Sequence, residues 1–239
     1  MPNPADPRLL DDPVWHALTG PHRRFAVASD HGTPRAYRYR VDVVPFAALR
    51  DVEDAGAWQD LAQLCGPEGR AALESRRAIA VPAGWTVSRV FPVAQMIAPV
   101  AGLAGLPESS ESIVTLDIRD SAEMMALAEL TRPGPFEAAT VELGGYVGIR
   151  RGGQLVAMAG RRLHLPGWIE ISAVCTHPDH RGQGLSTLLM TAVEAGIRAE
   201  GQRAFLHVLH DNTPALDLYR RLGFDTRADM TITAVQRSG

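Results

Sequence analysis

The chain has 239 residues and an almost balanced charge, with 24 basic and 27 acidic residues. All 24 basic residues are arginine, which excludes pyridoxal-phosphate and other Schiff-base enzymes, P-loop proteins and protein kinases, because each of these needs a lysine amine. The formal net charge of −3 also argues against a nucleic-acid partner held by bulk charge.

Cysteine content and the N-terminal segment restrict the class further. Cys65 and Cys175 stand far apart without a CxxC pattern, so we expect neither a disulfide framework nor a metal site. Residues 1–15 lack the positive and apolar regions of a signal peptide, and no run approaches the roughly 18 apolar residues of a membrane span. The sequence therefore favours a cytoplasmic protein without membrane contact.

The first half of the chain contains short, weakly marked elements. Residues 12–18 and 55–64 have the pattern of short helices. Residues 36–44, 77–81 and 85–96 are rich in Val, Ile, Phe and Trp, which predicts strands. No motif that carries chemistry occurs in this half.

A segment rich in Gly, Pro and Ser, residues 99–112, follows without helical or strand periodicity. It divides the chain into about equal halves. We therefore predict two domains, a divergent α/β domain over residues 1–111 and a second domain over residues 112–239.

The second half alternates strands and helices. Strands are predicted over residues 113–118, 146–150, 154–164, 168–176, 204–210 and 230–235, and helices over residues 121–130, 185–200 and 213–222. The last two helices have clear signals. The helix at residues 185–200 has an apolar face at i, i+3 and i+4 and is ended by Gly201. The helix at residues 213–222 has Pro214 in its first turn and is ended by Gly223. This order of elements predicts a mixed α/β sheet.

The loop at residues 176–186, THPDHRGQGLS, carries the clearest chemical signal. It directly follows a predicted strand and opens a long helix. Gly182 and Gly184 permit backbone angles and close approaches that other residues do not, and the helix N-terminus adds unpaired amides and partial positive charge. The pattern predicts a phosphate cradle, with a plain structural turn as the alternative. Dinucleotide binding is disfavoured because GxGxxG is absent.

A second constellation follows the next predicted strand and consists of Asn212, Ala215, Leu218, Tyr219, Gly223 and Phe224. Together with the loop it resembles the GNAT superfamily of acyl-CoA-dependent N-acyltransferases. The loop signature of that family is Arg or Gln, two residues, Gly, one residue, then Gly or Ala. Residues 181–186 match it except at Ser186, which leaves the affinity for the pyrophosphate open.

The resemblance covers residues 113–239 and implies a GNAT-like α/β fold, with a mixed, mostly antiparallel central sheet flanked by helices. Residues 153–161 and 168–177 are similar to the branch that contains the glycine N-acyltransferases. Members of that branch often carry a degenerate GNAT-like N-terminal domain, which suits a first half without motifs.

The resemblance also implies the reaction and the roles of several residues. The acceptor amine attacks the thioester of acetyl-CoA, or of another short acyl-CoA, directly in a ternary complex. The backbone N–H of Val174 matches the oxyanion-hole donor, Tyr219 the general acid for the CoA thiolate, and Asn212 a residue on the cofactor arm. A core tyrosine and a simple helix N-cap are the alternatives for the last two. The residues implied at the cofactor are Val174, Cys175, Thr176, Arg181, Gly182, Gln183, Gly184, Leu185, Ser186, Asn212, Ala215 and Tyr219.

Glu170 matches the strand glutamate that some family members use as a catalytic base. Strict alternation along the strand puts it on the same face as Val174. In a half-apolar cleft the pKa of this carboxyl would rise, and it could take a proton through water. A water chain alone is the alternative, and His207 and His164 are further candidates.

We therefore expect a GNAT-type N-acetyltransferase that acts on a primary amine of a small molecule or an amino acid, without a metal. Two other functions stay open. One is a non-catalytic acyl-CoA-binding regulatory module, which would not need Tyr219 or Glu170. The other is a protein acetyltransferase that acts on N-termini or lysines. The sequence leaves open which acceptor is used and whether the protein is a homodimer.

Overall fold

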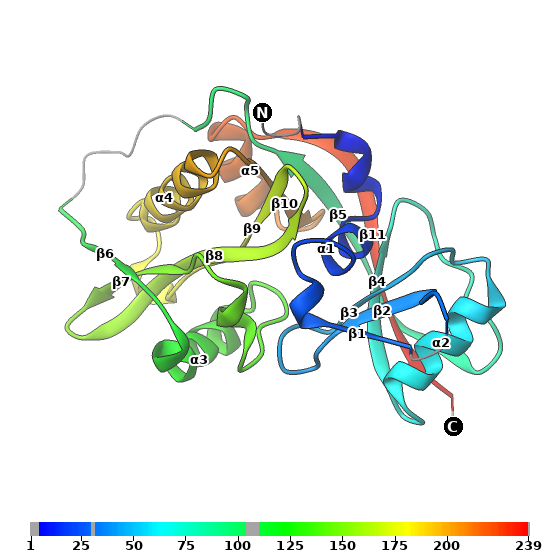
Figure 1. Ribbon diagram of the computed structural model, residues 1–239. Coiled ribbons are helices and arrows are strands. Elements are labelled where there is room, and N and C mark those ends of the chain that lie inside the picture. Colours follow the sequence, from blue (N-terminus) through cyan, green and yellow to red (C-terminus); the bar gives the residue numbers. More distant parts are fainter. Residues whose placement is uncertain (1–4, 30–31, 104–109, 239) are drawn as a thin grey trace.

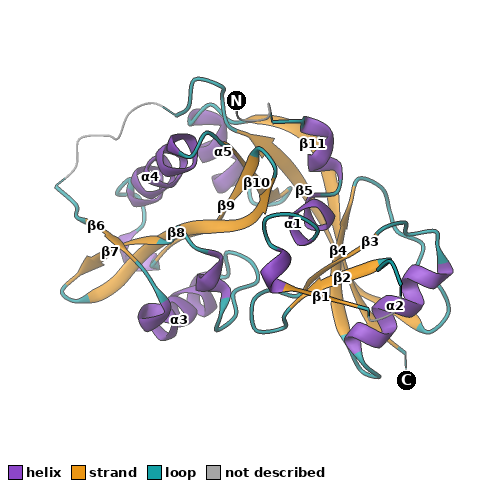
Figure 2. Cartoon of the chain, viewed as in Figure 1, coloured by secondary structure: helices purple, strands orange, loops and turns teal. Residues whose placement is uncertain are grey.

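The computed structural model describes residues 5–29, 32–103 and 110–238. These residues form one eleven-stranded, curled sheet with helices packed on it (Figures 1 and 2). Part of the predicted connection between domains, residues 104–109, lies outside the described residues. No helix in the described part of the chain is both long and apolar enough to cross a membrane.

Both halves of the chain contribute strands and helices. The strands are β1 (Ala26–Ala28), β2 (Ala36–Tyr39), β3 (Phe46–Leu49), β4 (Arg70–Ser75), β5 (Trp85–Ile97), β6 (Ile113–Thr115), β7 (Val147–Arg151), β8 (Gln154–Leu165), β9 (Trp168–Thr176), β10 (Arg203–Leu209) and β11 (Asp225–Arg237). The α-helices are α1 (Pro13–Leu18), α2 (Ala55–Cys65), α3 (Ser121–Thr131), α4 (Leu185–Ala199) and α5 (Thr213–Arg221). Short 3-10 turns, among them η1 (Pro7–Asp11) and η5 (Pro178–His180), connect some of them.

The strand order in the sheet is β1-β2-β3-β4-β11-β5-β10-β9-β8-β7-β6. Two neighbouring pairs are parallel, β3 with β4 and β9 with β10, and the others are antiparallel. Helices α3 and α4 both pack on β8 and β9. The predicted fold class, a mixed, mostly antiparallel sheet flanked by helices, is confirmed.

The two halves exchange strands in the middle of the sheet. Strand β5, from the first half, lies between β10 and β11 of the second half, and β11 in turn pairs with β4. The division at residue 111 therefore follows the connecting segment, whereas the sheet continues across both parts.

The first half also repeats the element order of the second. The run β2-β3-α2-β4-β5 has the same order as β8-β9-α4-β10-β11, except that α5 stands between β10 and β11. In both runs the helix crosses between two parallel strands. Figure 1 shows the two crossover helices, α2 and α4, at opposite ends of the molecule.

The predicted apolar face of α4 packs on the sheet. Leu188, Leu189 and Val193 are buried in one cluster with Ile169 and Ile171 of β9. Burying a side chain of this size contributes about 2 kcal/mol. The helix therefore holds its N-terminal loop firmly against the end of β9.

The elements predicted in the first half are less accurate. The strand predicted over residues 77–81 is wrong, because this segment is irregular and the strand lies at Arg70–Ser75. The sequence of β4, RAALES, has the composition of a helix, but its position between β3 and β11 buries Ala71 and Leu73 and decides its conformation. Strands β1 and β3 were also not predicted.

Candidate active site

The parallel strands β9 and β10 separate after a short stretch of pairing. They pair at three positions, the last of which joins Glu170 and Phe205. Beyond it, β9 continues to Thr176 along β8, whereas β10 continues to Leu209 along β5. Beyond Glu170 one edge of β9 therefore has no neighbouring strand, and we call this gap in the pairing between β9 and β10 the opening. An extended ligand can bind to the main-chain groups of such an edge.

A β-bulge lies in β9 beside this opening. Ala173 has a φ of 54°, and the register between β8 and β9 shifts opposite it. The bulge breaks the alternation, so Val174 packs on the α4 side together with Ile169, whereas Ala173 belongs to the cluster on the α3 side. The expectation that Glu170 and Val174 share a face is therefore wrong. Positive φ at a residue other than glycine costs about 1–3 kcal/mol and is concentrated at functional sites.

The loop before α4 has the backbone of an anion site. Gly182 and Gly184 have φ values of 73° and 74°, and a Cβ atom on either would meet nothing within 4 Å. No side chain caps α4, and its first main-chain hydrogen bond runs from the Leu188 N–H to the Gly184 carbonyl. The preceding amides of the helix have no intrahelical partner, and together they favour a negative charge.

Side chains around the loop hold it in place. The Arg151 guanidinium donates to Gln183 Oε1 at 2.6 Å, and Arg181 Nε donates to the Thr176 carbonyl at 3.3 Å. The hydroxyls of Thr176 and Ser186 lie 3.0 Å apart. Ser186, the one departure from the family signature, is thus tied to the end of β9. Arg151 was not predicted, since it lies far from the loop in the sequence and belongs to no motif.

The predicted cofactor residues lie on three elements that meet in one apolar cluster. Leu185 of α4 and Tyr219 of α5 belong to this cluster, and Val174 of β9 and Ala215 of α5 pack against it. Cys175 points to the other side of β9, and burial raises the pKa of its thiol to about 11. This thiol is therefore neutral at physiological pH and is not an activated nucleophile.

Tyr219 is buried in the cluster against which Val174 of β9 packs, with its ring 6.1 Å from that of Phe224. Burial, with a smaller contribution from Cys175, raises the pKa of its hydroxyl to about 12. The hydroxyl is therefore protonated at neutral pH, as a general acid must be. Asn212 accepts the Ala215 N–H at 3.3 Å, which confirms its role as the N-cap of α5, and its contact with the cofactor stays a prediction.

Glu170 lies in a buried ion-paired network and has no exposed surface. Its carboxylate accepts hydrogen bonds from Arg162 at 2.8 and 2.5 Å. The Nδ1 atom of His207 lies 2.8 Å from Glu170 Oε1, and the Nε2 atom lies 2.5 Å from Glu74 Oε1 of β4. The network therefore joins β8, β9 and β10 of the second half to β4 of the first.

The charges of the network fix the protonation of its members. Burial disfavours the Glu170 anion, but the charge and hydrogen bonds of Arg162, together with those of His207, outweigh it and lower the pKa of Glu170 to about 2. Burial also disfavours charged His207, but Glu74 and Glu170 raise its pKa to about 9. Glu170 consequently has little affinity for a proton near neutral pH. His164 packs against His22 instead, with ring centroids 6.0 Å apart.

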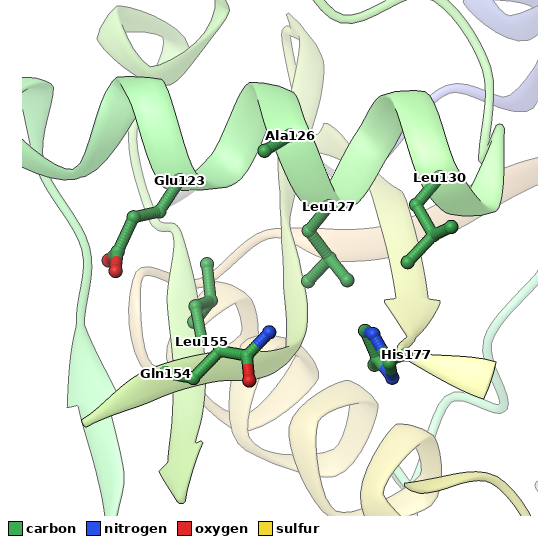
Figure 3. Close-up of a pocket in the computed structure, with 7 residues that line it drawn as sticks. All are labelled: Glu123, Ala126, Leu127, Leu130, Gln154, Leu155 and His177. Carbon is green, nitrogen blue, oxygen red and sulfur yellow. The ribbon is translucent and has the colours of Figure 1, made fainter. Parts of the chain in front are cut away.

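A pocket of about 260 Å³ lies between α3, the start of β8 and the residue that follows β9. In Figure 3, Leu127 and Leu130 descend from α3, and Gln154 and His177 lie across from them. Glu123 adds a carboxylate at one end. The pocket thus combines apolar walls with a few polar groups, as sites for small molecules do.

The FR47-like protein family matches residues 146–232, which include β9, the glycine loop and α5. No curated protein matches the chain. Among solved structures, a GCN5-related N-acetyltransferase from Kribbella flavida is 20% identical over 95% of this chain and 94% of its own, with a TM-score of 0.64. A GCN5-related N-acetyltransferase-like protein from Streptococcus suis is 18% identical over 95% and 92%, with a TM-score of 0.52. Both share the fold.

A much closer likeness is found to a protein from Novosphingobium aromaticivorans that was solved as an acetyltransferase of the GNAT family. The two chains are 39% identical over 96% of this chain and 99% of the other, and their TM-score is 0.84. The likeness therefore extends over both halves of the chain. This protein belongs to the GNAT family of acetyltransferases.

Proposed function

We propose that this acetyltransferase moves an acetyl or other short acyl group from acyl-CoA to a primary amine of a small molecule or amino acid, by direct attack in a ternary complex. The observation that carries the proposal is the opening between β9 and β10, which leads to the uncapped N-terminus of α4. Main-chain donors along a strand edge and an anion site at its end match a thioester arm that ends in a pyrophosphate.

The cofactor takes a defined course in this proposal. The pyrophosphate binds the amides of residues 181–186, where Gly182 and Gly184 leave space for it. The pantetheine arm follows the open edge of β9 towards the bulge. The N–H of Val174, beside the bulge, donates to the thioester oxygen as that oxygen gains negative charge.

Proton transfer uses one side chain and water. Tyr219 gives its proton to the departing CoA thiolate, which its protonated hydroxyl allows. A water chain takes the proton from the acceptor amine. Glu170 is a poor base because its pKa is about 2 and its oxygens are occupied by Arg162 and His207. Its proposed role is to hold His207.

The pocket beside His177 supports a small acceptor. Its volume of about 260 Å³ suits a small molecule, and Glu123, Gln154 and His177 supply the polar contacts. A protein acetyltransferase would need an open groove that accepts a peptide in extended form.

Turnover of acetyl-CoA with a panel of small amines, amino acids and peptides tests the proposal. We expect CoA release that is matched by an acylated small amine, identified by mass spectrometry. Acetyl-CoA binding without any acylated product would support a regulatory module. Acylation of peptides alone would support a protein acetyltransferase.

A further inference from the structure

The first half contains an opening of the same kind as the one between β9 and β10. Strands β3 and β4 are parallel and pair at two positions only, the last of which joins Ala47 and Leu73. A pocket of about 260 Å³ lies where they separate, and Asp11 of η1 and Asp12, the N-cap of α1, contribute to its lining. Its apolar walls include Ala48, Leu49 and Ile79.

The loop that follows β3 differs in chemistry from the glycine loop. Residues 50–54 read RDVED and contain no glycine. Asp54 caps α2 by accepting the Gly56 N–H at 2.7 Å, so a carboxylate already occupies the N-terminus of this helix. A pyrophosphate would be repelled there. The opening between β3 and β4 is therefore not a second acyl-CoA site.

Glu74 of β4 presents a buried carboxylate to this pocket. Its side chain is 1% exposed, and Oε1 forms the ion pair with His207. Oε2 has no hydrogen-bond partner among the described residues, and it is buried. A buried carboxylate oxygen without a donor costs free energy that a bound N–H group recovers.

Asp12 adds a second carboxyl group to the same pocket. One of its oxygens accepts the Trp15 N–H at 3.3 Å. Burial, together with the negative charge of Glu74, raises the pKa of Asp12 to about 7. The neighbouring Asp11 is already paired with Arg227 at 2.6 Å and with Arg76 at 3.3 Å. The lining also contains Asp51, Arg50 and Arg76, so the carboxylates of Asp11, Asp12, Asp51 and Glu74 outnumber its guanidinium groups.

We propose that this pocket binds the ammonium group of a small amine. Oε2 of Glu74 and the carboxylate of Asp12 accept its N–H groups, and the walls formed by Ala48, Leu49 and Ile79 contact its carbon chain. The site is separate from the opening between β9 and β10, and His207 connects the two by contacting Glu74 on one side and Glu170 on the other. The ammonium belongs either to the acceptor itself or to a second molecule that regulates the enzyme.

Calorimetric titration of the full chain with n-butylammonium chloride, without acetyl-CoA, tests the proposal. We expect binding in the millimolar range or tighter, and none for 1-butanol, which has the chain without the charge. Glu74→Gln should weaken binding about 10-fold or more, because a hydrogen bond to a charged group is lost. Glu53→Gln removes an equal charge from an exposed position outside the pocket and should leave the affinity unchanged.

If Glu74→Gln fails to fold, Asp12→Asn provides a second test of the site. Asparagine removes the charge of Asp12 and can still cap the helix. This variant should also weaken binding about 10-fold. Because a bound cation favours the Asp12 anion, binding to the wild type should release protons near pH 7, which titrations in buffers of different ionisation enthalpy measure. Asp12→Asn should abolish this release.

Three outcomes would overturn the proposal: no binding of n-butylammonium, equal binding of 1-butanol, or unchanged affinity in both Glu74→Gln and Asp12→Asn. The test is independent of catalysis, because Gly184→Asp, which blocks acetyl-CoA, should leave ammonium binding intact. If n-butylammonium binds and is also acylated, the pocket holds the acceptor. If it binds and is not acylated, the pocket serves a second molecule.

Discussion

The two crossovers β3-α2-β4 and β9-α4-β10 have the same topology and different chemistry. In both, a helix joins parallel strands that separate after two or three pairs. The loop in front of α4 contains Gly182 and Gly184 and leaves the helix uncapped, whereas Asp54 caps α2. The shared topology creates an opening in each half. The residues of the loop then decide whether a pyrophosphate suits the N-terminus of the helix.

The halves differ in a second way, because only the second half has a helix after its crossover. Helix α5 places Tyr219 in the apolar cluster against which Val174 of β9 packs, whereas the chain between β4 and β5 is irregular. The first half therefore has no counterpart of the proposed general acid. Repeating a fold does not repeat its chemistry unless the side chains on the added elements are repeated as well.

The largest expected effect comes from cutting the network that joins the two crossovers. Glu170→Gln leaves the buried Arg162 guanidinium without its ion pair, and His207 keeps only its ion pair with Glu74, so we expect the free energy of unfolding to fall by about 3–5 kcal/mol in urea denaturation. Glu123→Gln is the control, since it breaks a partly exposed ion pair with Arg150 and should cost less than about 1 kcal/mol. Equal losses in the two variants would contradict the structural role of Glu170.

Placing a carboxylate in front of α4 should make this crossover resemble the one at α2. Gly184→Asp should raise the Kd for acetyl-CoA about 100-fold by charge repulsion, since aspartate tolerates positive φ and suits a helix N-terminus. Gly201→Asp is the matched control, because Gly201 has a φ of 71° and equally open space but lies at the other end of α4. A similar loss of affinity in both variants would contradict the proposal that the glycine loop binds the pyrophosphate.

Removing the Tyr219 hydroxyl tests whether α5 gives the second half a general acid that the first half lacks. Tyr219→Phe should lower turnover about 10- to 100-fold, because water replaces the general acid poorly, while the Kd for acetyl-CoA stays within a few-fold. Steady-state kinetics and calorimetry measure the two quantities. Tyr37→Phe, in a half-buried tyrosine of the first half, should change neither. Unchanged turnover in Tyr219→Phe would exclude the hydroxyl from the reaction.

The smallest effect concerns the pH dependence of stability. The pKa of His207 is raised from 6.5 to about 9, so the stability from its charged form is complete below pH 6.5 and is lost as the pH rises through 9. Deprotonation leaves the ring and one hydrogen bond in place, so the loss should be smaller than in Glu170→Gln. The Tm measured from pH 6 to 10 should fall in the wild type more steeply than in His207→Gln. Equal dependence of Tm on pH in the two proteins would show that the stabilising charge is not on His207.

The second half could be predicted from the sequence because its signals are local. The caps of α5, the apolar face of α4 and the glycine loop each depend on residues within a few positions of one another. The fold of this half follows from them, and so does the position of the glycine loop at the N-terminus of α4. Strand β4 could not be predicted in the same way, because its neighbours β3 and β11 are what impose the extended conformation on RAALES.

The contacts of Glu170 could not be predicted from the residues close to it in the sequence. Alternation predicts a face only while a strand is regular, and the bulge at Ala173 is not visible in the residue pattern. Arg162 stands in the same hairpin as Glu170, so it was within reach of an argument from pairing. Glu74 and His207 come from different halves of the chain, and only the curled sheet brings them together.

The position of β5 has a consequence for the synthesis of the protein. Both neighbours of β5 in the sheet, β10 and β11, leave the ribosome after all other strands of this sheet. Until they do, this 13-residue strand exposes two unpaired edges, which are prone to aggregation. Neither half can be produced alone as an intact domain, because each lacks a central strand of its own sheet. The sheet is completed only when β10 and β11 are available.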